Sequence, residues 1–137
     1  MPKPYSESCD QNRVPILNAL APRVAGCRTL LEIGSGTGQH AVYFAPELPD
    51  LVWQTSDQRI QHAGIGQWLD EAGLANVLPP IALDVVQDAW PAGSFDAVFS
   101  ANTAHIMPET AVAAMFTGVG AVLADKGPFL LYGPFNY

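Results

Sequence analysis

The sequence predicts an α/β fold built on a doubly wound parallel sheet, and three observations support this prediction. Short, almost wholly apolar runs recur along the chain, which is typical of strands covered on both faces. Segments with helical spacing of apolar residues alternate with them. A glycine-rich turn joins the first run to the helical segment after it. Because such alternation implies right-handed crossovers, we expect a Rossmann-like sheet with strand order 3-2-1-4-5.

The chain of 137 residues has room for one domain. Residues 1–13 are polar and rich in proline, and we expect them to be a lead-in to a domain at residues 14–137. The first predicted helix spans residues 14–24, with Pro15 in its first turn and Gly26 after its end. Its apolar face consists of Ile16, Leu17, Leu20 and Val24.

Five strands and three more helices are expected after this helix. The strands share a high content of apolar residues and lie at 29–33, 51–55, 76–83, 95–101 and 128–132. The helices lie at 39–48, 60–72 and 108–123, and the last has Val112, Met115, Phe116 and Val119 on one side. Pro79 and Pro80 argue against a central position for the third strand.

Composition excludes several classes of protein. Hydrophobic residues make up 49% of the chain, which is enough for a packed core. The net charge is −7, and the six Lys and Arg residues are spread singly, so neither nucleic acid nor an anionic membrane is an expected partner. The start of the chain lacks the apolar region of a signal peptide, and no apolar run has the length of a spanning helix.

The cysteines and histidines indicate a reduced protein without a metal site. Cys9 and Cys27 provide neither a disulfide framework nor a metal quartet. His40, His62 and His105 lack the spacing of metal ligands. We therefore expect a cytoplasmic protein that uses no metal.

The turn in LLEIGSGTGQH, Leu30–His40, distinguishes between two kinds of cofactor. The dinucleotide fingerprint G-x-G-x-x-G, counted from Gly34, requires glycine where this chain has Gln39. The spacing is instead G-x-G-x-G, with Glu32 two residues before the first glycine. S-adenosylmethionine has a cationic amino-acid end, which Glu32 can organise while the glycines leave room for it. The alternative is a tight strand-to-helix turn that binds no ligand.

Acids follow the second and third predicted strands. Asp57 lies about 20 residues past the glycines, where a carboxylate can accept hydrogen bonds from both ribose hydroxyls. Gln58 or Arg59 is placed to flank the adenine. Asp84 can accept from the exocyclic amine of the adenine, and Val85 can pack on the ring. The alternatives are a local turn for Asp57 and a helix N-cap for Asp84.

The segment after the fourth strand, residues 100–107, is expected beside the sulfonium methyl group. Asn102 offers a carbonyl and an amide where a methyl acceptor would sit. His105 is the candidate general base of this segment. The alternative for His105 is a histidine packed against Met107 and Trp90.

Much of the chain resembles a methyltransferase-like family catalogued as a domain of unknown function, within the class I S-adenosylmethionine-dependent methyltransferases. The resemblance runs from around Gln11 to Asn136, and it is carried by LLEIGSGTGQHAVYFAPELP, VWQTSD, NVLPPIALDV, FDAVFSANTAHIM and FLLYGPFN. The segments FDAVFSANTAHIM and LLYGPFN are specific to this family, whereas the superfamily shares the glycine motif.

The resemblance implies S-adenosylmethionine as the cofactor. It implies that Asn102 lies near the sulfonium, that His105 faces the acceptor pocket and that Asn12 covers the cofactor. Gln11 stands where the family usually has arginine, which removes the basis for an anion contact there. The other residues that the resemblance assigns are Glu32, Gly34, Ser35, Gly36 and Gly38 for the methionine part, Asp57 for the ribose, and Asp84 with Val85 for the adenine.

Family members continue past the GPFN segment through a final helix and two strands. The resemblance therefore implies a chain truncated at its C-terminus, which lacks the usual strands 6 and 7. The apolar strand at 128–132 would then be an uncovered edge, and we expect a homo-oligomer that pairs through it.

The sequence thus predicts S-adenosylmethionine-dependent methyl transfer to an unidentified small-molecule or protein acceptor. The alternative is a protein that binds S-adenosylmethionine or S-adenosylhomocysteine without catalysis, because the cofactor half lies wholly before the fifth strand. A nicotinamide oxidoreductase is a third hypothesis, which Gln39 disfavours.

Overall fold

Five parallel strands form the central layer of the molecule. A computed structural model describes residues 3–101 and 108–133. The strands are β1 (Thr29–Ile33), β2 (Val52–Asp57), β3 (Val77–Ala82), β4 (Ala97–Ala101) and β5 (Phe129–Tyr132). They lie in the order β3-β2-β1-β4-β5, which confirms the predicted doubly wound sheet.

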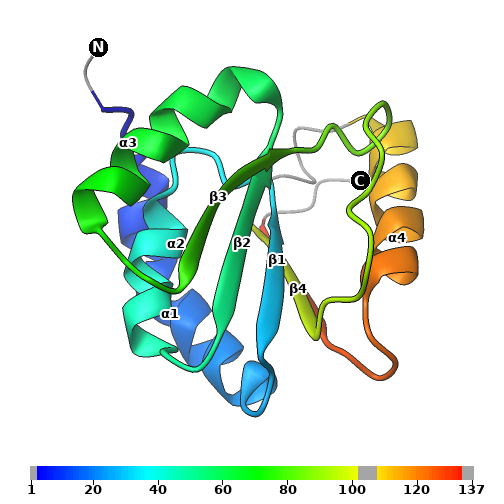
Figure 1. The fold of residues 1–137 in the computed structure, drawn as a ribbon, viewed down its shortest axis with the longest axis horizontal. Helices are drawn as coiled ribbons and strands as arrows, with labels where there is room; N and C mark the ends of the chain where they lie inside the picture. Colours follow the sequence, from blue (N-terminus) through cyan, green and yellow to red (C-terminus); the bar gives the residue numbers. More distant parts are fainter. Residues whose placement is uncertain (1–2, 102–107, 134–137) are drawn as a thin grey trace.

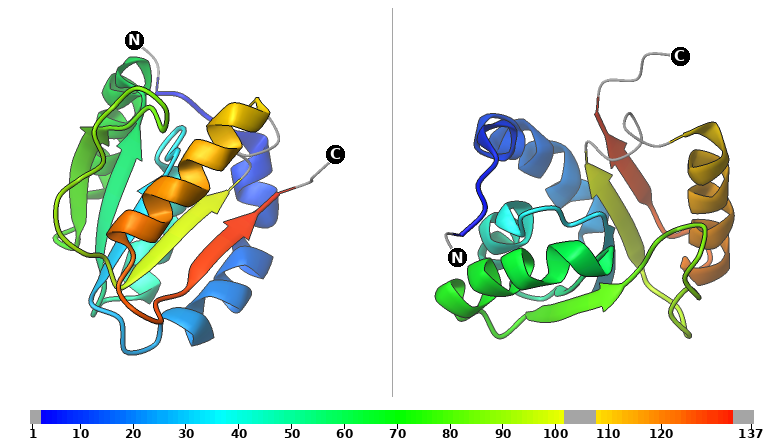
Figure 2. Two further views of the ribbon diagram at one scale, coloured as in Figure 1. Left: turned by 90° about the vertical axis from the view of Figure 1, so that its right-hand side faces the viewer. Right: turned by 90° about the horizontal axis from the view of Figure 1, so that it is seen from above.

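Helices cover both faces of this sheet. The α-helices are α1 (Glu7–Val24), α2 (Gln39–Phe44), α3 (His62–Ala72) and α4 (Glu109–Val122), and two short 3-10 helices are η1 (Ala45–Glu47) and η2 (Arg59–Gln61). Figures 1 and 2 show α1, α2 and α3 on one face and α4 on the other. The chain is thus a three-layer α/β/α arrangement.

The central strand β1 contributes to the core on both faces. Leu30 belongs to the cluster that includes residues of α1 and α2, whereas Leu31 and Ile33 belong to the cluster that includes residues of α4. All three side chains are buried, as expected for a strand that is covered on both sides. Side chains alternate along a strand, so Glu32 lies on the same face as Leu30.

Helix α1 begins earlier than the predicted helix, so residues 7–13 of the predicted lead-in are helical. Ser6 is the N-cap of α1, and its hydroxyl accepts from the backbone N–H of Cys9. Glu7 and Asp10 place acids in the first turn, which favours the N-terminus of a helix. Pro15 accordingly lies inside α1 instead of in its first turn.

The other elements differ from the predicted ones mainly at their ends. Pro46 follows α2, where the chain tightens into η1, so the predicted helix at 39–48 is divided. The predicted helix at 60–72 likewise begins as η2 before α3. Pro79 and Pro80 lie in β3, which is an edge strand as they indicate, and its pairing with β2 shifts register between Gln54 and Ser56.

The predicted apolar face of the last helix is correct in part. Met115 and Val119 are buried, whereas the side chain of Phe116 is 51% exposed. Phe116 packs edge-to-face on Phe129 of β5, with ring centroids 5.6 Å apart. Gly118 of the same helix is buried instead of Phe116. Because glycine has no side chain, the Trp90 ring fills the space beside it.

Among the residues that the structure describes, no helix is long and apolar enough to cross a membrane. The same residues contain no group of three or more His, Cys, Asp and Glu side chains placed to hold a metal ion. Cys9 and Cys27 are both free thiols.

Candidate functional site

A cavity of about 660 Å³ opens where the first three strands of the chain end. Parallel strands bring the loops after their carboxyl ends to one edge of the sheet, which is where doubly wound folds bind ligands. Seven of the predicted cofactor residues line this cavity: Gly34, Ser35, Gly36, Asp57, Gln58, Asp84 and Val85. The structure thus brings together the ends of β1, β2 and β3 as the sequence predicts.

The backbone of the glycine turn adopts conformations that favour glycine over other residues. Gly34 and Gly36 have φ angles of 70° and 63°, in the left-handed region. At least two N–H groups of the turn are already used inside the protein. Ser35 N donates to Ser56 O at 2.8 Å, and Gly36 N donates to the Asp57 Oδ2 atom at 2.8 Å. The N–H groups of Ser35 and Gly36 are therefore not available to a phosphate.

Asp57 ties the glycine turn to the end of β2. Its Oδ2 accepts from Gly36 N, and its Oδ1 accepts from Gln58 N at 2.7 Å. Burial raises the pKa of Asp57, and the hydrogen bonds from Gly36 and Gln58 act in the opposite direction. A carboxylate has about four lone-pair positions, so two remain for a ligand in the cavity.

Asp84 and Val85 form the part of the cavity wall that follows β3. Asp84 Oδ1 accepts from Val86 N at 3.0 Å and from Gln87 N at 3.2 Å, so Asp84 stabilises a local turn, and residues 85–87 are a turn and not the helix that the N-cap alternative required. Within the described residues, its Oδ2 atom has no hydrogen bond, so this turn leaves one oxygen for a ligand. Val85 and Leu83 add an apolar surface beside it.

Glu32 does not line the cavity, although we expected its carboxylate to organise a cationic group there. The side chain is 1% exposed, and its Oε1 accepts from Trp53 Nε1 at 3.0 Å. Burial raises the pKa of Glu32 from 4.5 to about 7. The alternation of β1 explains this position, because Glu32 faces the helices α1 and α2 whereas the cavity lies beyond the end of the strand.

Gly38 and Asn12 are also absent from the cavity wall. Gly38 has a φ of 94°, and a Cβ atom there would lie 3.3 Å from Trp68 Cβ, so this glycine lets the turn pack against α3. Asn12 lies within α1, and its Oδ1 is 2.8 Å from His40 Nε2. Asn12 therefore contacts a residue of the wall instead of the cavity itself.

Ser6, Cys9 and His40 are among the wall residues that were not predicted from the sequence. Ser6 followed by acids in the next turn is the sequence signal of a helix start. A prediction that uses this signal extends the first helix back to Glu7 and so toward the glycine turn. Burial lowers the pKa of His40 from 6.5 to about 4, so the imidazole is neutral near pH 7. Its ring stacks on Phe44 with centroids 5.2 Å apart.

The two predicted catalytic residues, Asn102 and His105, lie outside the described residues. Ala101 and Pro108, on either side of this segment, both line the cavity. Ala111, in the first turn of α4, lies beside Pro108 in the same wall.

Several solved structures are similar to this chain along most of its length. The S-adenosylmethionine-dependent methyltransferase SibL in its apo form matches with a TM-score of 0.82 and 21% identity over 93% of this chain and 37% of its own. An O-methyltransferase family protein from Burkholderia thailandensis matches with a TM-score of 0.77 and 15% identity, over 91% of this chain and 39% of its own.

A third similar structure is the glycopeptide N-methyltransferase MtfA complexed with S-adenosyl-L-methionine. Its TM-score is 0.73 at 19% identity, over 85% of this chain and 52% of that chain. The chain therefore spans between 37% and 52% of the lengths of these three structures. At these identities the likeness shows the fold, which is that of the Rossmann-like methyltransferases.

A family match covers nearly the whole chain. The family is described as "Protein of unknown function (DUF938)", and its match spans residues 3–137. The match includes all the strands and helices that build the cavity. The chain therefore belongs to the DUF938 family.

Proposed function

We propose that the cavity binds S-adenosylmethionine, and the charge of its wall is the observation that carries this proposal. The charged side chains in the described part of the wall are Asp57 and Asp84, and both are acids. S-adenosylmethionine carries a sulfonium, an ammonium and a carboxylate group, and its net positive charge is favoured by these acids. A dinucleotide would bring a pyrophosphate, which would lie near acids and near a turn in which the N–H groups of Ser35 and Gly36 are occupied.

The rest of the wall fits the nucleoside part of the same cofactor. Asp57 has two lone-pair positions left for the ribose hydroxyls. Asp84 Oδ2 can accept from the exocyclic amine of the adenine, while Leu83 and Val85 pack against the ring. The volume of about 660 Å³ lies within the range of cofactor sites.

We further propose that the protein transfers a methyl group to a small-molecule or protein acceptor. S-adenosylmethionine supplies the reactive methyl group, so the protein's task is to orient the two reactants and exclude water. The similar structures described as O- and N-methyltransferases support this activity. Asn102 and His105 remain the candidates for contacts with the acceptor.

Binding is tested by thermal unfolding with S-adenosylmethionine, S-adenosylhomocysteine and NAD in parallel. A ligand that binds only the folded state raises the melting temperature. We expect a rise with the first two ligands and none with NAD. A rise with NAD alone, or no rise with either of the other two, contradicts the proposed cofactor.

Transfer is tested by following the conversion of S-adenosylmethionine to S-adenosylhomocysteine with a cell extract as the source of acceptor. We expect Asn102→Ala and His105→Ala to slow turnover while the binding of S-adenosylhomocysteine persists. Binding without turnover by the parent protein would instead identify a cofactor-binding protein without catalysis.

A reducing, cytoplasmic location forms part of this proposal. It is supported by the two free thiols, of which Cys9 lies in the cavity wall and Cys27 at the opposite end of β1.

A further inference from the structure

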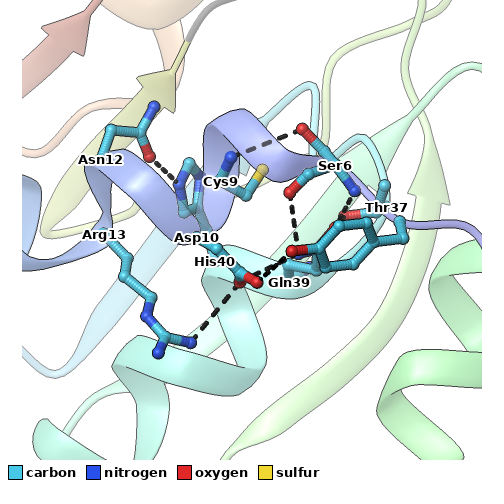
Figure 3. A network of polar contacts seen from close by, with 9 residues as sticks. Ser6, Cys9, Asp10, Asn12, Arg13, Thr37, Gln39 and His40 are labelled. Carbon is cyan, nitrogen blue, oxygen red and sulfur yellow. Dashed lines mark hydrogen bonds and ion pairs between the residues drawn. The ribbon is translucent and has the colours of Figure 1, made fainter.

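The first turn of α1 crosses the start of α2 and forms one side of the cavity. Ser6 and Cys9 line the cavity from α1, and Thr37 and His40 line it from the glycine turn and α2. Figure 3 shows these residues facing one another across a network of polar contacts. The N-terminal part of the chain is thus part of the candidate cofactor site.

Gln39 lies at the centre of this network. Its side chain is buried, and its Oε1 accepts from Ser6 N at 2.5 Å and from Thr37 Oγ1 at 2.8 Å. Its Nε2 donates to Ser6 O at 3.1 Å and to Asp10 Oδ1 at 3.2 Å. An amide side chain has two donor hydrogens and two acceptor lone pairs, so Gln39 uses its whole capacity here.

Separate contacts hold the chain on either side of this turn. Before it, Trp68 Nε1 donates to Pro4 O at 2.5 Å, and Lys3 pairs with Glu71 at 2.9 Å. After it, Asn12 Oδ1 bonds to His40 Nε2 at 2.8 Å. Loss of the Gln39 contacts would therefore free the Ser6–Asp10 turn while both flanks stay attached.

We propose that Gln39 is a positioning residue that holds the first turn of α1 closed against the cavity, and that the cofactor affinity depends on this closure. The identity of the ligand rests on the proposed function, whereas the closure does not. The position is the one at which a dinucleotide fingerprint has glycine, and glycine has no side chain to make these four bonds.

Cys9 provides a direct measure of the closure. It is half-buried between the two sides of the network, and burial raises the pKa of its thiol, so the closed form protects it from thiol reagents. In a Cys27→Ser background, Cys9 is the single thiol, and its rate of modification by N-ethylmaleimide is measured without ligand. We expect Gln39→Ala to raise this rate by about tenfold, because several hydrogen bonds that favour the closed form are lost.

Gln11→Ala is the matched control. Gln11 is an exposed residue of α1 whose Nε2 bonds to Glu7 within the same helix, away from the Gln39 network. We expect this variant to leave the Cys9 rate unchanged. A Cys9 rate in Gln39→Ala equal to that of the parent, or an equal rise in Gln11→Ala, overturns the proposed closure.

Ligand binding is then measured on the same variants. We expect S-adenosylhomocysteine to slow the modification of Cys9 in the parent and to bind Gln39→Ala about tenfold more weakly. Equal affinities overturn the dependence on closure. If the parent binds no S-adenosylhomocysteine but Gln39→Ala still exposes Cys9, the closure stands and the proposed cofactor is wrong.

A charge exchange keeps the test decisive if Gln39→Ala fails to fold. Gln39→Glu places a carboxylate beside Asp10 and should raise the Cys9 rate through repulsion. Adding Asp10→Asn restores a donor–acceptor pair between the two positions and should lower the rate again. Equal rates in the single and double variants contradict a role for this contact in the closure.

Discussion

A buried carboxyl group and a buried imidazole, Glu32 and His40, depend on pH in opposite ways. Burial raises the pKa of Glu32 to about 7 and lowers that of His40 to about 4. The contribution of protonated Glu32 to the free energy of unfolding is fully present below its ordinary pKa of 4.5. This contribution is lost as the pH rises to about 7. The stability linked to neutral His40 is present above pH 6.5 and is lost as the pH falls toward 4.

We therefore predict that Glu32→Gln changes the pH dependence of stability. The amide can still accept from Trp53 but cannot ionise, so the parent should lose stability relative to the variant between pH 4.5 and about 7. The relative change should amount to as much as about 3 kcal/mol. Denaturant unfolding across this range measures it, with Glu47→Gln at an exposed side chain as the control. A difference that does not vary with pH would contradict the prediction.

Asp57→Asn should weaken the binding of S-adenosylhomocysteine. The amide keeps one acceptor oxygen, so it cannot hold both Gly36 N and Gln58 N and also accept from the ribose. A hydrogen bond to a charged group contributes about 1.5–3 kcal/mol, which corresponds to a loss of roughly 10- to 100-fold in affinity. Isothermal titration calorimetry measures the loss. Asp50→Asn, at an exposed carboxylate before β2, should bind as the parent does.

The residues at the strand ends could be predicted because parallel strands deliver their following loops to one edge. Asp57, Asp84 and Val85 meet in the cavity for this reason. Glu32 and Asn12 do not follow this rule, because Glu32 lies within β1 and faces the layer of α1 and α2, and Asn12 lies within α1 and contacts His40, which is far away in the sequence. Spacing alone does not show which partner a side chain finds.

Helix α4 packs on the segment after β3 through a glycine. A Cβ atom on Gly118 would clash with the ring of Trp90, whereas one on Gly120 would meet nothing within 4 Å. We predict that Gly118→Ala lowers the free energy of unfolding by about 1–3 kcal/mol through overpacking. Gly120→Ala, in the same helix, should raise it by about 0.5–1 kcal/mol because alanine loses less backbone entropy. Denaturant unfolding of both variants checks the pair, and equal effects would contradict it.

At the scale of elements, the existence and order of the strands could be predicted because their apolar runs are distinct. The start of α1 could not be predicted from periodicity, since residues 7–13 are polar and have no apolar face, and its sequence signal is the cap at Ser6. The end of α2 and the start of α3 also differ from the predicted bounds, because 3-10 turns extend both helices there. Hydrogen-bonded caps, such as Ser6, set such boundaries.

For the whole molecule, we propose that two copies associate through β5. This strand lies at the end of the strand order, so within the described residues its outer edge has no partner strand. Sedimentation velocity should show self-association of the parent and its loss in Tyr132→Lys, which places a charge on the edge. Val14→Lys, at an exposed apolar residue of α1, is the control. A parent that is monomeric at every concentration contradicts this proposal.

The central position of β1 also determines the order in which the chain can fold. On one side Leu30 pairs with Trp53, but on the other it pairs with Ala97, which the chain reaches only after β2 and β3. Contacts between distant residues form slowly, so we expect β1, β2 and β3 to associate before β4 joins them. During synthesis, the edge of β1 that later pairs with β4 is therefore exposed while β2 and β3 are already in place. We expect the nascent chain to be most prone to pair with another chain at this stage.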